Sequence, residues 1–307
     1  MISIVIPVYN EKDSVAALHA ELLAVLREVG KPFEIIFVDD GSTDGTVAEL
    51  QKLKPIHLIA FTRNFGKSQA LQAGFREAKG KYIFTMDGDL QDDPKEIPRF
   101  LAMAKEGDFD LICGWKQRRL DSFAKRIVSK IANAITRFFT GTRVHDMNCG
   151  FKLYRKEVVA TLDLYGDMHR YIPALLATHG FHIAELPIVH RERKFGVSKY
   201  GNFRRFSKSF FDFVTLLLIR RFIDRPMHFF GIIGTVSAMI GGAILGYLAY
   251  LKIFESAVIG NRPILLLGVL LVVIGIQLFS SGFLGEILIR QNTGRSVYTV
   301  REKNEQS

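Results

Sequence analysis

Short apolar runs alternate with helix-periodic segments through the first hundred residues of the chain. Four runs have the length and the β-branched or aromatic content of buried strands: residues 2–8, 33–38, 56–61 and 82–86. Apolar positions at helical spacing follow each run: residues 13–29, 47–53, 67–78 and 94–105. Such alternation predicts an α/β fold, with a mostly parallel sheet covered by helices on both faces.

Beyond residue 109 the alternation becomes less regular. We expect a strand at 109–114 and a basic amphipathic helix at 121–139, followed by a loop at 140–152. A further helix at about 168–178 and a strand at 182–189 complete this part of the chain. The whole of residues 1–200 is therefore predicted to be one domain.

The last third of the chain has a different character. Residues 227–251 contain no Lys, Arg, Asp or Glu, and Glu286 is the only such residue in 264–289. Each segment exceeds the roughly 20 residues that a helix needs to cross the hydrocarbon core of a bilayer, so we expect a two-helix transmembrane hairpin at 226–290. A cytosolic tail at 291–307 would follow it.

The segment before the hairpin, residues 201–225, carries an apolar stripe between basic ends. The stripe consists of large apolar side chains at helical spacing: Phe203, Phe206, Phe210, Phe213 and Leu217. This pattern is typical of a helix that lies in the membrane interface, although a core helix would show the same stripe.

Charge supports a membrane rather than a nucleic acid as the partner of this region. The chain has 41 Lys and Arg against 31 Asp and Glu, a net charge of +10, and the basic residues crowd 191–225, directly before the first predicted span. Anionic lipid headgroups account for such a cluster. Arginines on the same side of both spans place both ends in the cytosol and the 252–263 connection outside. With two cysteines and no signal peptide at residues 2–8, we expect a multi-pass protein of the cytoplasmic membrane whose catalytic domain is cytosolic.

Polar clusters follow the predicted strands, at residues 9–11, 39–44, 63–67 and 87–91. Ligands of open α/β sheets bind beyond the carboxyl ends of the strands, so these clusters are candidate site residues. Gly88 is expected to allow a turn that directs Asp87 and Asp89 toward the same space. With Gln91 they would suit Mg²⁺ or Mn²⁺ carried in with a diphosphate. The alternative is a polar turn in which Asp92 and Asp93 open a helix.

Three motifs, in this order and spacing, resemble family 2 glycosyltransferases: Ile-Pro-Val-Tyr-Asn-Glu at 6–11, Val-Asp-Asp-Gly-Ser-Thr-Asp at 38–44 and Asp-Gly-Asp at 87–89. Arg-Asn-Phe-Gly-Lys at 63–67, Gln91 and the C-terminal pair of spans look like the polyprenyl-phosphate branch of that family. The resemblance implies the Rossmann-like nucleotide-diphospho-sugar transferase fold. It also implies inverting, metal-dependent transfer of a hexose from a UDP-glucose-like donor or GDP-mannose to undecaprenyl or dolichyl phosphate.

The same resemblance assigns roles to individual residues. Four would surround the nucleoside: Pro7, Tyr9, Glu11 and Asp40. Asn64, Gly66 and Lys67 would lie near its base and phosphates, and Asp87 would contact both donor and metal. The chemistry of two residues supports this independently, because a tyrosine ring stacks on a base and a carboxylate accepts hydrogen bonds from it.

The expected acceptor, an ionised phosphate monoester, is already a nucleophile and needs mainly positioning and positive charge. Asp146 matches the acidic position of the family's acceptor loop, while Asn148 and Cys149 stand where a small hydroxyl residue is frequent. Candidate cations near the acceptor are Arg118, placed in the catalytic set, and Arg137, Arg143, Arg193 and Lys199, for each of which an ordinary solvated charge is the alternative. His169 and Arg170 are possible acceptor-side groups, left outside the catalytic set because a lone helical histidine is more often structural.

Two other functions are considered. A processive polysaccharide synthase would need more spans and a Gln-x-x-Arg-Trp motif, whereas the only tryptophan, Trp115, follows Gly114. An inert membrane scaffold of the same fold would not need Asp40, Asp87 and Asp89. The expected partners are therefore a nucleotide sugar, a polyprenyl phosphate and membrane lipids, without nucleic acid, and a homo-oligomer is possible.

Overall fold

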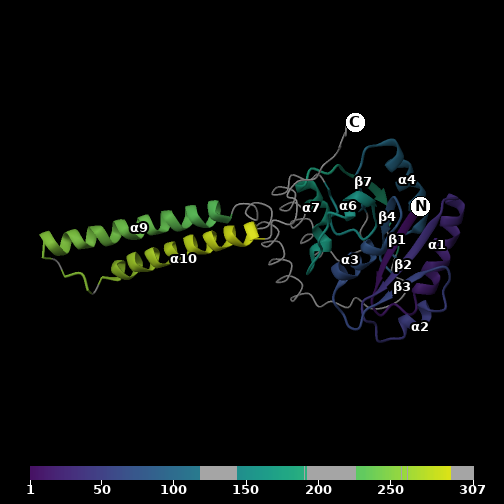
Figure 1. Ribbon diagram of the computed structural model, residues 1–307, viewed down its shortest axis with the longest axis horizontal. Coiled ribbons are helices and arrows are strands. Elements are labelled where there is room, and N and C mark those ends of the chain that lie inside the picture. Colours follow the sequence, from purple (N-terminus) through teal and green to yellow (C-terminus); the bar gives the residue numbers. More distant parts are fainter. Residues whose placement is uncertain (118–143, 190, 192–225, 257, 261, 292–307) are drawn as a thin grey trace. The chain divides into compact units, whose positions relative to one another are not determined.

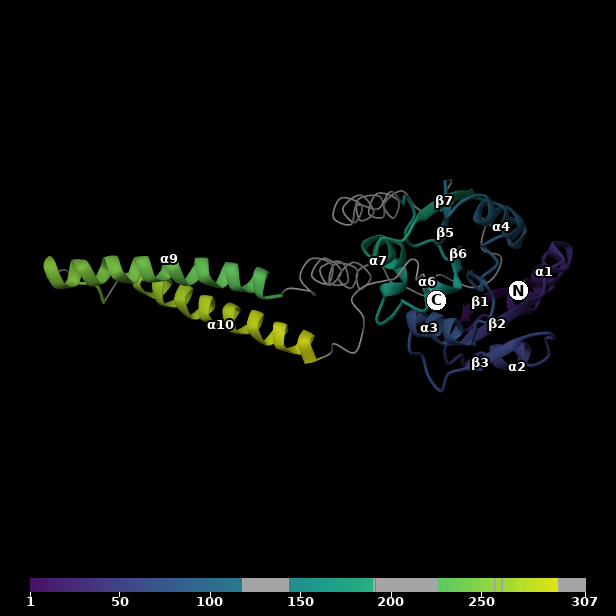
Figure 2. The same ribbon diagram turned by 45° about the horizontal axis from the view of Figure 1, so that its top comes forward.

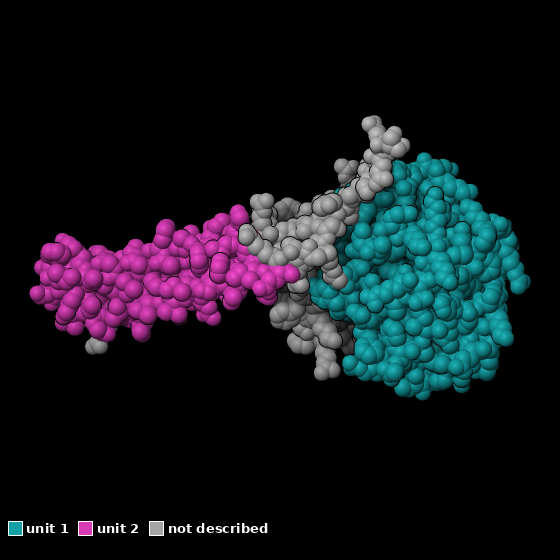
Figure 3. Space-filling model, in the orientation of Figure 1, with its two compact units in different colours: residues 1–213 teal, residues 214–307 magenta. Residues whose placement is uncertain are grey.

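A computed structural model describes residues 1–117, 144–189, 191, 226–256, 258–260 and 262–291 of the chain. The chain divides into two compact units, Met1–Phe213 and Val214–Ser307, which are described separately (Figure 3). The predicted helices at 121–139 and 201–225, the tail at 291–307 apart from Gln291, and the first part of the loop at 140–152 lie outside the described residues.

The described part of the first unit contains one seven-stranded sheet with the strand order β3-β2-β1-β4-β6-β5-β7 (Figures 1 and 2). Its strands are β1 (Ile2–Val8), β2 (Phe33–Asp39), β3 (His57–Ala60), β4 (Tyr82–Thr85), β5 (Leu111–Lys116), β6 (Lys152–Arg155) and β7 (Ile183–Ile188). All neighbouring strands are parallel except β6, which runs antiparallel to both β4 and β5. The predicted α/β class with a mostly parallel sheet is confirmed.

Helices follow the strands as the periodicity predicts. They are α1 (Val15–Val29), α2 (Thr46–Leu50), α3 (Lys67–Glu77), the 3₁₀ turn η1 (Pro94–Glu96) with α4 (Ile97–Glu106), α6 (Lys156–Val159), and the 3₁₀ turn η2 (Met168–Tyr171) with α7 (Ile172–Thr178). The helix expected at 47–53 is shorter than predicted and ends at Leu50. Asp93 caps η1 by accepting a hydrogen bond from the Lys95 backbone N–H, as its position before Pro94 indicated.

Strand β1 lies in the interior of this sheet, between β2 and β4, and is buried on both faces. Ile2, Ile4 and Ile6 pack with the apolar stripe of α1 and with α4 in one continuous core. On the opposite face Gly74 of α3 lies so close to β1 that a Cβ on it would be 2.3 Å from Val5 Cγ1. Each fully buried aliphatic side chain contributes about 1.5–3 kcal/mol, so the two faces fix the register of β1.

Strand β6 was missed by the sequence analysis. Its four residues, Lys-Leu-Tyr-Arg, begin and end with a charge and are too few to show a period. They form a strand because β4 and β5 supply hydrogen-bonding edges on either side. Tertiary pairing therefore decides the conformation here, not local preference.

The second unit contains two long helices, α9 (Pro226–Phe254) and α10 (Pro263–Gln291). Both are long and apolar enough to cross a membrane. They pack through glycines: a Cβ on Gly234 would lie 2.6 Å from the Gly275 carbonyl oxygen, and one on Gly241 would lie 2.6 Å from that of Gly268. Such close backbone approach through small residues is typical of helix pairs in bilayers.

Candidate functional site

The parallel register brings the ends of four strands, β1 to β4, to the same edge of the sheet. Val8 of β1 pairs with Asp39 of β2, Asp39 pairs with Ala60 of β3, and Val5 pairs with Thr85 of β4. Residues that follow these strands therefore meet at this edge, as the sequence predicts.

The segments after β1 and β2 are hydrogen-bonded to each other. Asn10, in the left-handed region with φ of 53°, donates its backbone N–H to Ser42 Oγ at 2.8 Å and accepts at Oδ1 from the Thr43 N–H at 2.8 Å. The backbone N–H of Glu11 donates to Thr46 Oγ1 at 2.9 Å. Tyr9 and Glu11 are thus held beside the 39–44 turn.

Asp40 supports the neighbouring 63–67 loop. Its carboxylate is 4% exposed and accepts from the backbone N–H groups of Phe65 at 2.7 Å and Gly66 at 2.9 Å. Burial raises the pKa of Asp40 despite these bonds. Gly41 lies so close to the same loop that a Cβ on it would be 2.3 Å from the Arg63 carbonyl carbon. Asp40 therefore shapes the loop that carries Asn64 and Lys67.

Asp39 was not selected by the sequence analysis, although one of its carboxylate oxygens has no partner among the described residues. It is 1% exposed, and its Oδ2 accepts from the Ser42 N–H at 2.9 Å. Its buried Oδ1 has no hydrogen-bond partner among the described residues. A buried acceptor of this kind is costly unless a donor reaches it, which makes Asp39 a candidate contact for a nucleotide base. The adjacent pair Asp39-Asp40 was the signal in the sequence.

The exposed face of the 63–67 loop is aromatic and basic. The Arg63 guanidinium lies 4.4 Å from the centre of the Phe65 ring, and Phe65 meets Phe61 edge to face with 5.6 Å between the ring centres. Asn64 is exposed beside them. Gly66, with φ of 97°, precedes Lys67 at the start of α3.

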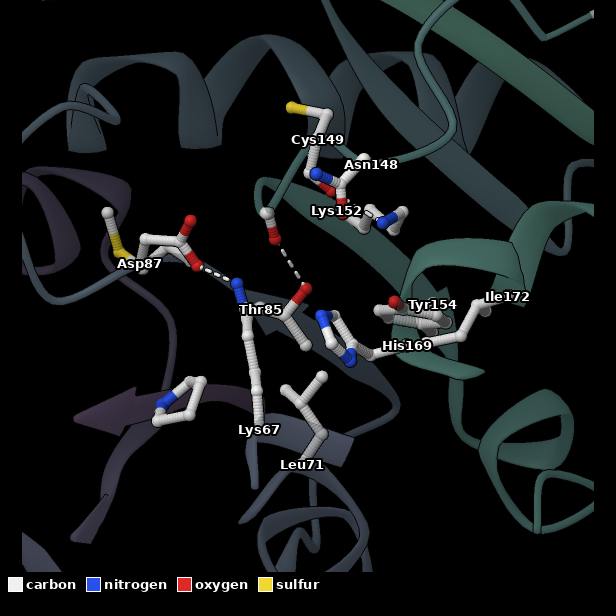
Figure 4. Close-up of a pocket in the computed structure, with 13 residues that line it drawn as sticks. Lys67, Leu71, Thr85, Asp87, Asn148, Cys149, Lys152, Tyr154, His169 and Ile172 are labelled. Carbon is white, nitrogen blue, oxygen red and sulfur yellow. Dashed lines mark hydrogen bonds and ion pairs between the residues drawn. The ribbon is translucent and has the colours of Figure 1, made fainter. Parts of the chain in front are cut away.

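Asp87, directly beyond Met86 and β4, is surrounded by positive charge (Figure 4). Its carboxylate forms an ion pair with Lys67, and its backbone N–H donates to Asp92 Oδ2. Lys116 lies 2.9 Å from Asp92 Oδ1. Burial alone would raise the pKa of Asp87, but the charges of Lys67 and Lys116 hold it well below its usual range. Because about a third of the side chain remains exposed, at 32%, an ionised carboxylate faces the pocket.

Asp89 and Gln91 lie in the turn after Asp87. Asp89 is 7% exposed and accepts from the Gln91 N–H at 3.2 Å. The role expected for Gly88 is wrong: its φ is not in the left-handed region, and Leu90, with φ of 63°, makes the turn instead. Gly88 is required because a Cβ there would lie 2.7 Å from Val8 Cγ1.

The residues of this turn fit a divalent ion of the Mg²⁺ or Mn²⁺ type. Asp87 and Asp89 offer hard carboxylate oxygens, Gln91 offers an amide oxygen, and Asp87 already holds one cation, the Lys67 ammonium. No group of three or more His, Cys, Asp or Glu side chains gathers in the described residues. The set suits an ion that takes the rest of its ligands from a phosphate.

The loop at 144–151 is fixed at both ends. Glu185 of β7 accepts from the backbone N–H groups of His145 and Asp146, at 2.7 and 3.0 Å. Asp146 is 2% exposed, so its side chain points into the protein. At the other end Thr85 Oγ1 donates to the Gly150 carbonyl at 2.8 Å, and a Cβ on Gly150 would lie 2.6 Å from the Asp87 carboxyl carbon. The loop therefore lies directly against Asp87.

Lys152 and His169 line the same pocket, together with Lys67, Asp87 and Asn148 (Figure 4). Lys152 is 3% exposed and donates to the Cys149 carbonyl. The sequence analysis passed over Lys152 because the strand that carries it was missed. It left His169 out of the catalytic set because a lone helical histidine is more often structural, and its partner Ser68 lies 101 residues away in the sequence.

Of the basic region at 191–225, the structure describes only Arg191. Arg191 pairs with Glu21 and with Asp93, both at 2.6 Å, and its backbone N–H donates to the Gln91 carbonyl at 3.0 Å. Its charge is thus neutralised within the first unit, which corrects the assignment of this residue to headgroup binding. The other basic candidates lie outside the described residues: Arg118, Arg137, Arg143, Arg193 and Lys199.

Comparison with known proteins agrees with this geometry. A family model described as glycosyl transferase family 2 matches residues 3–163, just over half of the chain. A dodecaprenyl-phosphate galacturonate synthase from Rhizobium johnstonii is 37% identical over 297 residues, covering 94% of this chain and 88% of the relative. An undecaprenyl-phosphate 4-deoxy-4-formamido-L-arabinose transferase from Pectobacterium carotovorum is 35% identical over 295 residues, with the same coverages.

Solved structures share the fold at low sequence identity. Mannosyl-3-phosphoglycerate synthase from Rubrobacter xylanophilus gives a TM-score of 0.59 at 15% identity, over 71% of this chain and 74% of that one. Glucosyl-3-phosphoglycerate synthase from Mycobacterium tuberculosis, in complex with Mn²⁺ and UDP-glucose, gives 0.57 at 18% identity, over 72% and 78%. At these identities the similarities show the fold alone.

Proposed function

Because the chain belongs to glycosyl transferase family 2, we propose that it transfers a sugar from a nucleotide-diphosphate sugar to a polyprenyl phosphate. The relatives named for this acceptor match 94% of the chain. The observation that carries the proposal is the ion pair of Asp87 with Lys67 beyond the end of β4, where the charges of Lys116 and Lys152 also act on Asp87. A site that brings two phosphate-bearing substrates together needs cations close to the reacting groups.

The donor nucleotide is proposed to lie over the ends of β1 and β2. Pro7, Tyr9 and Glu11 border this region, and Asn64 and Gly66 approach it from the 63–67 loop. Asp40 acts through that loop, because its oxygens are hydrogen-bonded to the loop backbone. Asp39 is added to the proposed base contacts because its Oδ1 lacks a donor among the described residues.

We propose that Asp87, Asp89 and Gln91 hold a divalent ion that neutralises negative charge on the diphosphate. Lys67 would neutralise part of this charge directly. When bound, Mg²⁺ or Mn²⁺ would neutralise charge on the leaving diphosphate as a Lewis acid. Lys67 forms an ion pair with Asp87 and is free to turn its ammonium toward a phosphate oxygen once that carboxylate has another cation. Buried Lys152 keeps this side of the pocket positive.

The acceptor phosphate is proposed to attack the anomeric carbon from the face opposite the diphosphate, which inverts its configuration. A phosphate monoester is ionised near neutral pH, so positioning and not proton abstraction limits the rate. Arg118 is proposed to bind this phosphate. Asp146 is a positioning residue, because its buried carboxylate belongs to the loop that lies against Asp87.

The proposal also covers the identity of the transferred sugar and the topology of the chain in the membrane. Transfer of a hexose from a UDP-glucose-like donor or GDP-mannose remains our expectation, and the relatives' names extend the candidates to galacturonate and an arabinose derivative. We also propose that α9 and α10 cross the membrane as a hairpin, with residues 1–200 and the tail in the cytosol and 201–225 at the interface.

The test is transfer by the purified full-length protein. It is incubated with polyprenyl phosphate, Mn²⁺ or Mg²⁺, and each of five radiolabelled donors: UDP-glucose, UDP-galacturonate, GDP-mannose, UDP-galactose and UDP-linked 4-deoxy-4-formamido-L-arabinose. We expect one label to enter the organic phase as a single sugar on the lipid. Label in a polymer would support the processive synthase, and no transfer from any donor would contradict the proposal.

A further inference from the structure

His169 and Ser68 are 101 residues apart in the chain and are joined by two hydrogen bonds. Ser68, fully buried in the first turn of α3, accepts from the His169 backbone N–H at 3.1 Å. The same hydroxyl oxygen lies 2.9 Å from His169 Nδ1. One side chain therefore fixes both the position of η2 and the orientation of the imidazole ring.

The imidazole of His169 is uncharged. Burial lowers its pKa to about 2, and the positive charges of Lys67, Arg170 and Lys152 add to this effect, against the weaker influence of Asp87. A neutral imidazole carries a single N–H, on one of its two nitrogens. The ring is therefore neutral, and its hydrogen bonding depends on which of the two nitrogens carries the proton.

Ser68 decides the tautomer. Its oxygen accepts the backbone N–H of His169, and its buried hydroxyl hydrogen has no acceptor other than His169 Nδ1 among the described residues, so it donates to that nitrogen. With Nδ1 accepting, the ring proton lies on Nε2, because the partner of one imidazole nitrogen sets the role of the other. The ring extends from η2 toward the Lys67 and Thr85 side of the pocket (Figure 4). Its N–H donor consequently faces the space beside Asp87.

The polar groups around that space are mainly hydrogen-bond donors. Lys67, Lys152 and the amide of Asn148 line it with His169, and Asp87 is the carboxylate among them. A pocket of this composition binds oxygens that carry negative charge, and a neutral donor adds direction without adding charge.

We propose that His169 is a further catalytic residue, whose Nε2–H donates a hydrogen bond to a phosphoryl oxygen of a substrate. This proposal rests on the proposed function, since it names the group that the same site would recognise. The phosphoryl oxygen belongs either to the diphosphate of the nucleotide sugar or to the phosphate of the lipid acceptor. Both present the same chemistry to the ring, and the two sources are separated by experiment.

The first experiment reads the ring directly and needs no activity. Full-length protein labelled with ¹⁵N-histidine is examined by NMR in detergent micelles, and the His169 signals are assigned from their loss in His169→Gln. We expect a neutral ring with the proton on Nε2 between pH 6 and 8, which shifts when UDP, GDP or a short-chain polyprenyl phosphate is added. A ring protonated on Nδ1, a cationic ring, or signals unmoved by all three ligands would overturn the proposal.

The second experiment uses a matched pair of amides. Glutamine places its side-chain N–H₂ near the position of histidine Nε2, whereas asparagine reaches only as far as Nδ1. Removing one such donor typically costs about 10²–10³ in kcat. We expect His169→Ala and His169→Asn to lose about 10²-fold in turnover and His169→Gln to recover most of it.

The Michaelis constants identify the source of the oxygen. A raised KM for the nucleotide sugar with weaker UDP or GDP binding assigns the diphosphate, and a raised KM for the lipid alone assigns the acceptor phosphate. Equal activity of all three variants and the parent would refute a contact at Nε2. If the parent itself transfers no sugar, the proposed function fails, and the NMR result still decides the role of His169.

Discussion

Glu185 and His145 are joined through both the backbone and the side chain of the histidine. The carboxylate accepts the His145 backbone N–H at 2.7 Å through Oε1, and its Oε2 lies 2.7 Å from His145 Nδ1. The imidazole also stacks on Trp115, with 4.5 Å between the ring centres and 16° between the planes. One carboxylate of β7 thus fixes the start of the loop whose far end, Gly150, lies against Asp87.

Replacing this carboxylate is expected to loosen the loop. Glu185→Gln keeps the size of the side chain but weakens bonds to an acceptor that is charged, each worth about 1.5–3 kcal/mol. We expect sugar transfer to fall about tenfold, mainly through kcat, measured as initial rates at saturating donor and lipid. The control is Glu34→Gln, which alters another carboxylate that accepts from Ser3 and from the Lys79 backbone, in a different part of the unit. If both variants lose activity equally, Glu185 has no special relation to the site.

Asp89→Asn tests the metal. It exchanges one hard, charged ligand for a neutral amide, so turnover is expected to drop by two or more orders of magnitude and the Mn²⁺ concentration for half-maximal rate to rise. Transfer rates are measured across a metal titration, with folding followed by circular dichroism. Asp108→Asn, at a carboxylate that is 59% exposed, is the control. Full activity of Asp89→Asn, or of the parent in excess chelator, would contradict the metal-dependent mechanism.

The neutral His169 predicts a specific dependence of stability on pH. Its folded pKa of about 2 lies below the ordinary 6.5, so between these values the unfolded chain binds one proton more than the folded one. The contribution of this histidine to the free energy of unfolding is complete above pH 6.5 and falls as the pH decreases, by at most about 1.4 kcal/mol per pH unit.

Thermal midpoints of the parent and of His169→Gln in detergent, measured from pH 8 to 5, check this. The difference between them is expected to stay constant above pH 7 and to change in favour of the variant below pH 6. The charged and titratable groups Lys67, Lys152, Arg170 and Asp87 are the same in both proteins. A constant difference over the whole range would mean that folding does not lower the pKa of the histidine.

Two adjacent glycines test the packing of the hairpin. A Cβ on Gly241 would lie 2.6 Å from the Gly268 carbonyl oxygen, whereas one on Gly242 would meet nothing within 4 Å. Gly241→Leu is therefore expected to separate α9 from α10 and to lower the thermal midpoint of the second unit, while Gly242→Leu leaves it unchanged. Both variants have the same composition and the same hydrophobicity, so membrane insertion serves as the common control. Equal effects would mean that the glycine contact does not hold the helices together.

The proposed topology predicts which side of the membrane each end occupies. Cysteines introduced near Ser307 are expected to react with an impermeant maleimide only after the membrane has been permeabilised. Cysteines introduced near Gly260 are expected to react with the same reagent in intact cells. The native Cys113 and Cys149 are buried, so their background labelling is low. Labelling of the C-terminus in intact cells would require an odd number of crossings.

Much of the architecture follows from periodicity. The alternating strands and helices up to residue 106, and the two apolar helices, appear where the pattern indicates. The comparisons confirm the resemblance to family 2 glycosyltransferases, which rested on three polar motifs. These features depend on local spacing, which a single sequence displays.

The parts that were missed depend on contacts between distant residues. Strand β6 exists because two edges are available to it, Ser68 orients a histidine 101 residues away, and Arg191 is paired with Glu21 of α1. The role predicted for Gly88 was wrong for the same reason, because the residue that leaves no room for a side chain there is Val8 of β1, which is distant in the sequence. The sequence around each of these residues does not indicate its partner.

The strand order also has a consequence for synthesis of the protein on the ribosome. β5 pairs with β6 and β7, and both of these are made after it. The chain up to about residue 106 can assemble β1 to β4 with their helices as it emerges, whereas the apolar β5 has no neighbour until residues 152–155 leave the exit tunnel. Nascent chains that stall between these points expose an unpaired hydrophobic strand, the kind of segment that chaperones bind. Adding β6 pairs β5 with the finished half of the sheet and ends that vulnerable interval.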